Sequence, residues 1–256
     1  MPTASSRLLE GKRALVTGAS KGIGAEIAHA CAQAGADVIL SGRSGAELAS
    51  LSDRLRESYG VRAEILVADL AMPDAPTQVA RESLSIFEGL DILVNNAGIS
   101  YPEFVTDITE PNFDAVLNVN LRAPALLAAK IGSAMADAGG GAIVTVASAA
   151  ALRALPEHYS YCVAKAGLVM ATKVLALELG SRGVRANSVC PTVVLTEMGQ
   201  TVWGEHDKAA PMLNRIPSGR FAMPNEVSEA VVWLASDAAA MVNGTDLPID
   251  GGYLVS

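Results

Sequence analysis

The sequence is poor in the residues that build metal sites and disulfide frameworks. It contains three cysteines and three histidines in 256 residues. The cysteines, at positions 31, 162 and 190, form no CxxC pair, and an odd number cannot all pair with one another. We therefore expect free, buried thiols. Because the histidines show no paired ligand spacing either, we expect no metal.

Positive charge and long apolar runs are also scarce. Lys and Arg total 19 against 27 Asp and Glu, which gives a formal net charge of -8, and they form no cluster. Nucleic-acid and anionic-membrane surfaces need clustered cations, so we expect neither partner and favour a small molecule. No apolar run reaches the roughly 18 residues that span a bilayer, and residues 1–16 do not resemble a secretory leader. We therefore expect a cytoplasmic protein.

The chain also lacks linkers, repeats and like-charge blocks, which favours a single domain over residues 1–256. Short β-branched or leucine-rich runs alternate with alanine-rich stretches, as in βα units of a parallel sheet. We expect strands at 13–18, 37–42, 63–69, 91–98, 142–148, 184–189 and 245–250. We expect helices near 22–34, 45–58, 75–88, 111–137, 158–181 and 224–236. The expected fold is α/β: a Rossmann-type doubly wound sheet of seven mostly parallel strands flanked by helices.

Three glycines follow the first expected strand in the stretch TGASKGIG. Gly18, Gly22 and Gly24 fall in the turn between that strand and the helix at 22–34. Backbone without Cβ atoms can approach a pyrophosphate closely, and the N–H groups and dipole of a helix N-terminus attract it. The context predicts a dinucleotide site, with a merely tight turn as the plainer alternative.

The end of the second expected strand bears on the choice of cofactor. An acidic residue about 20 residues after the glycine loop normally holds the ribose hydroxyls of NAD. Here the sequence is Ser41-Gly42-Arg43-Ser44. Arg43 suits a 2′-phosphate, and Lys21 within the glycine loop adds a second positive charge. Together they predict NADP(H), although either one alone could be a solvated surface cation.

The stretch HYSYCVAK at 158–165 holds two tyrosines and a lysine. On a helix, Tyr161 and Lys165 lie on one face, four residues apart, whereas Tyr159 has no such relation to the lysine. A cation about 4 Å from the phenol, at an effective dielectric near 20, contributes about 4 kcal/mol and could bring the phenol pKa from about 10 towards 7. Tyr161 is therefore the expected proton donor. Ser148, at the end of the fifth expected strand, is the expected second donor to the developing alkoxide.

In their order along the chain, these motifs resemble the short-chain dehydrogenase/reductase family over nearly its whole length. The matching segments are TGASKGIG, Asp69-Leu70, NNAG at 95–98, Asn120 in NVNL, Ser148 and YCVAK. The resemblance implies a catalytic set of Asn120, Ser148, Tyr161 and Lys165. In that set Asn120 holds a water, and Lys165 also holds the nicotinamide ribose. The resemblance further implies that Asp69 contacts the adenine and that Asn95 supports the sheet beside the cofactor.

Two binding sets follow from the same resemblance. The residues implied to bind NADP(H) are Gly18, Ser20, Lys21, Gly22, Ile23, Gly24, Arg43, Asp69, Leu70, Asn96, Ala97, Gly98, Tyr161, Lys165, Pro191, Val194 and Thr196. The residues implied to line the substrate pocket are Ser148, His158, Tyr161 and Trp203. For His158 a helix cap, and for Trp203 a core or lid aromatic, remain as plainer alternatives.

The second half, especially CPTVVLTEMGQTVW and MLNRIPSGRFA, is similar to the L-xylulose (dicarbonyl) reductase branch of this family. This implies reversible, NADPH-dependent reduction of a small polar ketose or α-dicarbonyl, in a homotetramer that uses the helices at 111–137 and 158–181. Two departures are Pro191-Thr192 in place of the family's usual Pro-Gly, a change also seen in this branch, and Gly42 in place of the branch's hydroxyl residue. The alternatives are a 3-oxoacyl-carrier-protein reductase, another carbonyl or polyol dehydrogenase, and a non-catalytic NADP-sensing protein.

Overall fold

The protein is built around one parallel sheet. The structure, a computed structural model, describes residues 7–203 and 206–256. The strands are β1 (Arg13–Thr17), β2 (Asp37–Gly42), β3 (Ala63–Val67), β4 (Ile92–Asn95), β5 (Gly141–Val146), β6 (Val184–Pro191) and β7 (Asp246–Ile249). Their order is β3-β2-β1-β4-β5-β6-β7, and every pairing is parallel. The strand order reverses between β1 and β4, which is where open α/β sheets bind ligands.

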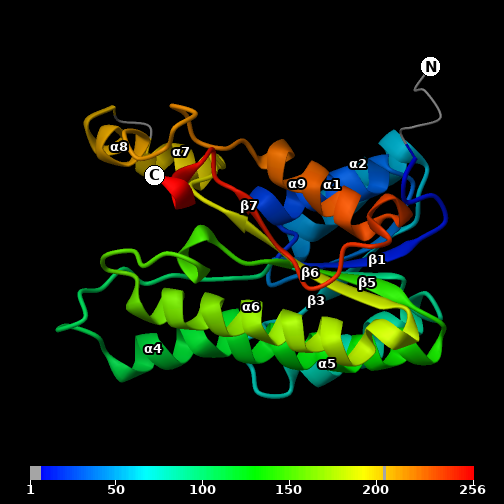
Figure 1. The fold of residues 1–256 in the computed structure, drawn as a ribbon. Coiled ribbons are helices and arrows are strands. Elements are labelled where there is room, and N and C mark those ends of the chain that lie inside the picture. Colours follow the sequence, from blue (N-terminus) through cyan, green and yellow to red (C-terminus); the bar gives the residue numbers. More distant parts are fainter. Residues whose placement is uncertain (1–6, 204–205) are drawn as a thin grey trace.

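Two helical layers cover the sheet (Figure 1). One layer holds α1 (Gly22–Gln33), α2 (Gly45–Tyr59) and α9 (Pro224–Ala235), and the other holds α3 (Ala75–Ile86), α5 (Ala123–Asp137) and α6 (Tyr159–Leu179). Neighbouring strand residues such as Leu15 and Val16 enter opposite apolar clusters, because side chains alternate across a strand. The predicted α/β fold with helices on both faces is confirmed.

The single helix predicted at 111–137 is instead three segments. α4 (Glu110–Leu117) leads into a π-helical turn, Asn118–Arg122, and the chain then continues as α5. The π-helical turn carries Asn120, which is fully buried. The pattern of hydrophobic residues in the sequence did not reveal this π-helical turn. Such turns are frequent at functional sites. The prediction of one continuous helix is therefore wrong at the position that carries a predicted catalytic residue.

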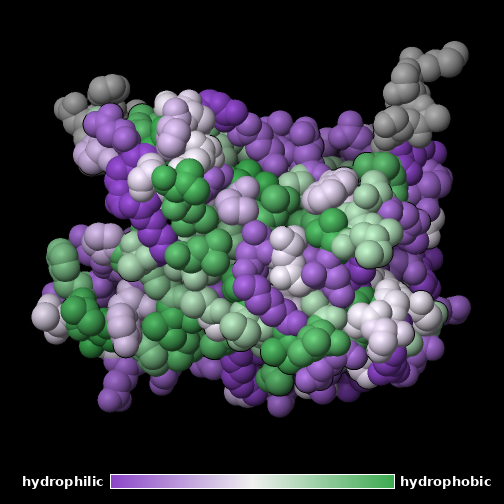
Figure 2. Space-filling view, viewed as in Figure 1, coloured by the Kyte–Doolittle hydropathy of each residue, from purple (hydrophilic) through white to green (hydrophobic). Residues whose placement is uncertain are grey.

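Two short helices follow β6 and are absent from the predicted elements. They are α7 (Glu197–Trp203) and α8 (His206–Leu213). Figure 1 shows them near the C-terminus, at the end of the sheet where the strands finish. Figure 2 shows the surface indented at that end. Trp203 packs there in a small apolar cluster with Phe221 and Tyr253, so this segment stands beside the carboxyl edge of the sheet.

Smaller differences concern the ends of elements and the thiols. β5 ends at Val146, and Ser148 instead begins a 3-10 turn, Ala149–Ala151. All three cysteines are free; two are buried, while Cys162 is only half-buried. Within the described ranges, no helix is long and apolar enough to cross a membrane.

Candidate active site

The predicted catalytic residues meet where β5 ends and α6 begins. Lys165 is buried, its Nζ lies 5.6 Å from the centroid of the Tyr161 ring, and it donates a 2.8 Å hydrogen bond to the carbonyl of Val146. The Ser148 side chain lies near enough to the Tyr161 phenol to lower its pKa. Tyr159 lies elsewhere: it is 50% exposed and stacks on Phe113 with the ring centroids 6.5 Å apart.

Removal from water governs the ionisation of both groups. Desolvation raises the pKa of the Tyr161 phenol above its ordinary value of 10.0, and the nearby Ser148 side chain opposes that rise. Desolvation also lowers the pKa of the Lys165 ammonium to about 8. The predicted lowering of the phenol pKa by Lys165 is therefore wrong in this structure. The lysine points at the Val146 carbonyl, and the low-dielectric surroundings disfavour the charged form of each group.

Asn120 and Gly98 complete this part of the site. Oδ1 of Asn120 accepts a hydrogen bond from the Ile99 N–H at 2.8 Å, and its Nδ2 donates to the Ile99 carbonyl at 2.7 Å. A Cβ atom on Gly98 would stand 3.3 Å from Asn120 Oδ1 and 3.7 Å from Lys165 Nζ. Asn120 and Lys165 thus border one small space, while the amide of Asn120 fixes the strand-to-loop turn. Its role in holding a water stays a prediction.

The glycine loop has the geometry that close approach of a phosphate requires. Gly18 and Gly22 have positive φ values of +64° and +60°. A Cβ on Gly24 would lie 2.1 Å from the Gly18 carbonyl oxygen, so only glycine fits this crossing of α1 over β1. Lys21 is the N-cap of α1, yet no side chain caps the helix and its first turn holds no acidic residue. The free N–H groups and the helix dipole fit a pyrophosphate.

Thr17, which is not among the predicted site residues, ties the loop to the end of β4. Its Oγ1 accepts hydrogen bonds from the backbone N–H of Asn96 at 3.0 Å and of Ala97 at 3.2 Å. Nδ2 of Asn96 donates in return to the Thr17 carbonyl at 3.0 Å. The available signal was a hydroxyl residue at the end of an otherwise apolar strand, directly before Gly18. The predicted Asn96 and Ala97 are thereby placed against the glycine loop.

Two cations border the loop without protein partners. Lys21 and Arg43 are exposed, and neither side chain makes a hydrogen bond or ion pair with any described residue. A Cβ on Gly42 would lie 3.7 Å from Ser20 Oγ, so the end of β2 adjoins the glycine loop. Asp69 is exposed after β3, where its Oδ1 accepts a 3.0 Å hydrogen bond from the Ala71 N–H.

The segment after β6 returns towards the same loop. Pro191 ends the strand, and Val194 is buried and pairs with Ala222. A Cβ on Gly22 would lie 3.5 Å from Thr196 Cγ2. A residue predicted to meet the pyrophosphate and one predicted to meet the nicotinamide are thus neighbours. Of the other predicted binding residues, Ile23 packs against the apolar cluster on one face of the sheet, and Leu70 belongs to the cluster on the other face.

The two predicted pocket residues, His158 and Trp203, lie near the carboxyl edge in different settings. The His158 ring stands 6.1 Å from the Tyr161 ring in an edge arrangement, and its Nδ1 hydrogen-bonds with the Pro156 carbonyl at 2.7 Å. His158 is the N-cap residue of α6, but its side chain caps nothing. Trp203 packs against Phe221 with centroids 5.7 Å apart. His158 thus stands beside Tyr161, whereas the ring contact of Trp203 is with Phe221.

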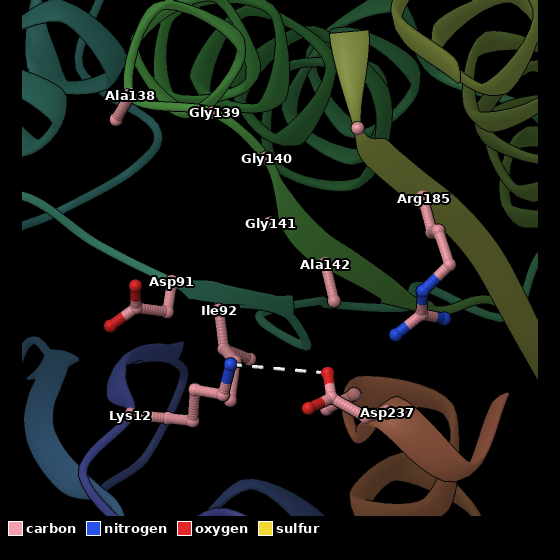
Figure 3. Close-up of a pocket in the computed structure, with 12 residues that line it drawn as sticks. Lys12, Asp91, Ile92, Ala138, Gly139, Gly140, Gly141, Ala142, Arg185 and Asp237 are labelled. Atoms are coloured by element: carbon pink, nitrogen blue, oxygen red, sulfur yellow. Dashed lines mark ion pairs between the residues drawn. The ribbon is translucent and has the colours of Figure 1, made fainter. Parts of the chain in front are cut away.

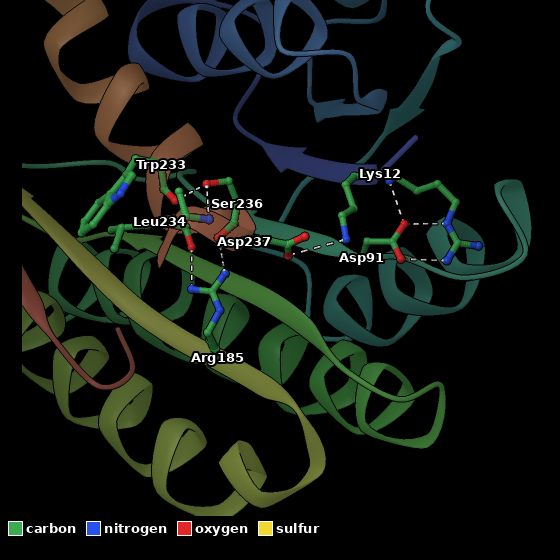
Figure 4. Close-up of polar contacts among 9 residues, drawn as sticks. Lys12, Asp91, Arg185, Trp233, Leu234, Ser236 and Asp237 are labelled. Atoms are coloured by element: carbon green, nitrogen blue, oxygen red, sulfur yellow. Dashed lines mark hydrogen bonds and ion pairs between the residues drawn. The ribbon is translucent and has the colours of Figure 1, made fainter. Parts of the chain in front are cut away.

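A hollow of about 320 Å³ lies at the opposite, amino edge of the sheet (Figure 3). It is lined by four charged residues, which bind to other groups of the protein: Lys12, Asp91, Arg185 and Asp237. Arg185 donates to the carbonyls of Leu234 at 2.7 Å and Ser236 at 3.0 Å (Figure 4). Lys12 lies 3.9 Å from Asp237. Partnered in this way, these charges hold the end of α9 against the sheet.

Comparisons with known proteins agree with this geometry. Residues 18–254 match the family model described as enoyl-(acyl carrier protein) reductase. The chain is 44% identical to D-threitol dehydrogenase of Mycolicibacterium smegmatis, over 96% of this chain and 94% of that protein. It is also 44% identical to L-xylulose reductase of Mesocricetus auratus, over 97% of this chain and 98% of that protein.

A solved structure gives the same result. L-sorbose reductase from Gluconobacter frateurii, complexed with NADPH and L-sorbose, has a TM-score of 0.89 and 32% identity, covering 97% of this chain and 98% of that one. The chain belongs to the short-chain dehydrogenase/reductase family. It is an oxidoreductase that acts on alcohol or carbonyl groups.

Proposed function

We propose that this enzyme reduces the carbonyl of a small polar ketose or α-dicarbonyl to an alcohol, reversibly and with NADPH. The observation that carries the proposal is the meeting of Ser148, Tyr161 and Lys165 beside the glycine loop. The names of the relatives support the substrate class, since one is a D-threitol dehydrogenase and another an L-xylulose reductase.

In this proposal each catalytic side chain has one task. The Tyr161 hydroxyl donates a proton to the carbonyl oxygen, and the Ser148 hydroxyl donates a hydrogen bond to the same oxygen as negative charge develops on it. Lys165 places a cation close to both. A bound NADPH would supply the hydride. Because desolvation raises the pKa of Tyr161, the phenol stays protonated at neutral pH, which suits a proton donor in the reducing direction.

The preference for NADP(H) rests on the two unpartnered cations. Arg43 and Lys21 border the loop that would hold the pyrophosphate, and a 2′-phosphate would give them a partner. The solved L-sorbose reductase was complexed with NADPH. The remaining predicted binding residues, Asp69, Asn96, Gly98, Val194 and Thr196 among them, would hold the adenosine, ribose and nicotinamide groups.

Self-association and a cytoplasmic setting belong to the same proposal. The outer face of α5 and α6 exposes large apolar side chains, and Figure 2 shows hydrophobic surface in this region. They are Leu126, Val163, Met170, Val174 and Leu177, the last being 83% exposed. An apolar stripe of this kind marks an association surface, and we propose that it joins the subunits of a homotetramer.

A second candidate is a reductase of acyl groups on a carrier protein, which the description of the family model favours. Such an enzyme needs cations to dock an acidic carrier. Arg122, Lys130 and Lys173 are scattered cations that could serve this role, but two of them are engaged. Arg122 donates to the Pro73 carbonyl at 3.1 Å, and Lys173 pairs with Asp246 at 2.6 Å. Lys130 is exposed, but one lysine makes a weak docking surface.

A screen of NADPH oxidation tests these alternatives together. The purified enzyme is assayed with four- and five-carbon ketoses, vicinal diketones and acetoacetyl thioesters, with the Tyr161→Phe variant as the blank. We expect the highest kcat/KM with a ketose or a diketone. A clear preference for the thioester would establish the second candidate instead. Tight NADPH binding with no oxidation on any carbonyl would mark a non-catalytic sensor.

A further inference from the structure

The turn that follows the catalytic serine fixes the direction of its hydroxyl. Ser148 is the N-cap of the 3-10 turn Ala149–Ala151, and these four residues form the Ser148 turn. Its Oγ accepts a hydrogen bond from the Ala150 N–H at 3.1 Å. A serine hydroxyl has one hydrogen and two acceptor lone pairs, so this bond occupies a lone pair and leaves the hydrogen free to donate. The aim of that hydrogen depends on where the Ser148 turn lies.

Arg153 stands two residues after the Ser148 turn and contacts the C-terminal turn, Tyr253–Val255. Its backbone N–H donates to the Ala149 carbonyl at 2.9 Å, which fixes the arginine to the Ser148 turn. Its guanidinium carbon lies 4.7 Å from the centroid of the Tyr253 ring, and Nη1 donates to the Tyr253 carbonyl. One side chain thus joins the Ser148 turn to a residue 100 positions further along the chain.

The C-terminal turn that this arginine contacts is itself fixed to the sheet. The Asp250 carboxylate, directly after β7, accepts hydrogen bonds from the Gly252 N–H at 2.9 Å and the Leu254 N–H at 2.8 Å. Tyr253 is 0% exposed and packs in one apolar cluster with Ala149. Figure 1 shows the C-terminus beside α7, at the edge where the strands finish. The C-terminal turn is therefore a firm support for whatever binds to it.

A second arginine contacts the same ring from another segment. Arg215 lies after α8, and its guanidinium carbon is 5.1 Å from the centroid of the Tyr253 ring. Its backbone N–H donates to the Met212 carbonyl at 3.1 Å, within the α8 segment and not in the Ser148 turn. The two arginines share one ring but belong to different segments. Arg215 is therefore a matched control for Arg153.

We propose that Arg153 is a positioning residue for the catalytic serine. By joining the Ser148 turn to the C-terminal turn, it keeps the Ser148 hydroxyl directed at the substrate oxygen. The inference rests on the proposed function and deepens it, because it names what holds one of the two donors in place. Arg153 itself does not touch the reacting atoms. Its effect passes through Ser148, and it matters because a misplacement of about 1 Å in a catalytic group can cost about 100-fold in rate.

The test is a double-mutant cycle of Arg153→Met and Ser148→Ala, assayed by NADPH oxidation with the preferred ketose. Methionine keeps an apolar stem but removes the charge and the hydrogen bonds. We expect Arg153→Met to lower kcat about tenfold and to leave KM and the NADPH dissociation constant nearly unchanged, because only a transition-state contact weakens. Ser148→Ala should lower kcat by about 10²–10³. Adding Arg153→Met to Ser148→Ala should lower kcat by less than about twofold more, because the group that Arg153 positions is gone.

Two further variants separate positioning from a general effect on folding. Arg215→Met removes the other guanidinium from the Tyr253 ring, and it should lower the melting temperature while keeping kcat. Arg153→Lys keeps a cation and a donor, and it should restore most of kcat. Equal losses of kcat in the two methionine variants, or a tenfold loss that persists in the Ser148→Ala protein, would overturn the inference. If Ser148→Ala kept the wild-type kcat, the proposed role of Ser148 in catalysis would fail, and the inference with it.

Discussion

At the amino edge of the sheet, the charged side chains have protein partners. Arg13 binds Asp91 through two hydrogen bonds of 2.8 Å and 3.0 Å, and Arg185 holds carbonyls at the end of α9. At the carboxyl edge, Lys21 and Arg43 have no partner in the described part of the chain, and no side chain caps α1. The first arrangement stabilises the fold, whereas the second leaves groups for a ligand to satisfy.

The two edges are otherwise alike: the amino edge has a hollow, and the carboxyl edge has a loop, and both are rich in glycine and charged residues. The amino-edge hollow has a volume of about 320 Å³ and includes three successive glycines, Gly139 to Gly141. Shape alone would therefore suggest a binding site there. The two edges differ in whether their charged side chains have protein partners. Unpartnered groups are expected at functional sites, and partnered groups elsewhere. Substitutions at the two edges should accordingly affect different properties.

The largest expected effect is that of Tyr161→Phe at the carboxyl edge. Loss of the proton donor should lower kcat by about 10²–10⁴, the usual contribution of a positioned general acid. Tyr159→Phe, two residues away on the exposed side of α6, is the matched control and should change kcat little. Steady-state NADPH oxidation measures both. Equal losses in the two variants would contradict the assignment of Tyr161.

The next effect concerns the choice of cofactor. Arg43→Ala should weaken NADPH binding by roughly 10- to 100-fold, because hydrogen bonds to charged groups contribute about 1.5–3 kcal/mol, and should leave NADH nearly unchanged. Lys21→Ala should act in the same direction but less, since an ammonium cannot make a bidentate contact. Titration of each variant with both cofactors, followed by fluorescence, gives the dissociation constants. Parallel loss of both cofactors would assign these residues to folding.

A smaller effect should appear in the pH dependence of stability. The pKa of Lys165 is lowered from 10.5 to about 8 by burial, so between these values the unfolded chain binds a proton that the folded chain does not. The free energy of unfolding of the cofactor-free protein should therefore rise with pH, by about 2 kcal/mol between pH 8 and 10.

The control for this rise is Lys165→Met, which removes the titrating group. Urea unfolding of both proteins at several pH values below 10 avoids the range in which the tyrosines ionise. The difference between wild type and variant isolates Lys165 from the other groups that titrate. If the two proteins showed the same slope, the lowered pKa of Lys165 would be contradicted.

The fold could be predicted from the sequence because the apolar runs, the glycine positions and the helical spacing all indicated the same alternation of strands and helices. Buried parallel strands appear as short apolar runs, and glycine or charged residues mark their ends. The positions of Tyr161 and Lys165 followed from helical spacing alone. Their electrostatics did not, because spacing does not reveal that Lys165 donates to Val146 or that desolvation is the largest influence on the pKa of Tyr161.

What the sequence could not provide depends on contacts between distant segments. The π-helical turn that carries Asn120 and the short helix α7 were both missed. The role of Thr17 became clear only when its partners, the backbone N–H groups of Asn96 and Ala97, were known. Contacts of this kind join segments far apart in the chain, so no local pattern predicts them.

The smallest expected effect is at the amino edge, with Lys12→Met. Lys12 lies 3.9 Å from an Asp237 side chain that is 92% exposed, and exposed ion pairs contribute about 0–1 kcal/mol. The variant should therefore lose at most about 0.5 kcal/mol of stability in urea unfolding, because the methionine keeps the packing of the lysine stem. Its kcat, KM and NADPH affinity should equal those of the wild type. A change in any of these three would mean that the amino-edge hollow communicates with the active site, and the division between a structural edge and a functional edge would have to be abandoned.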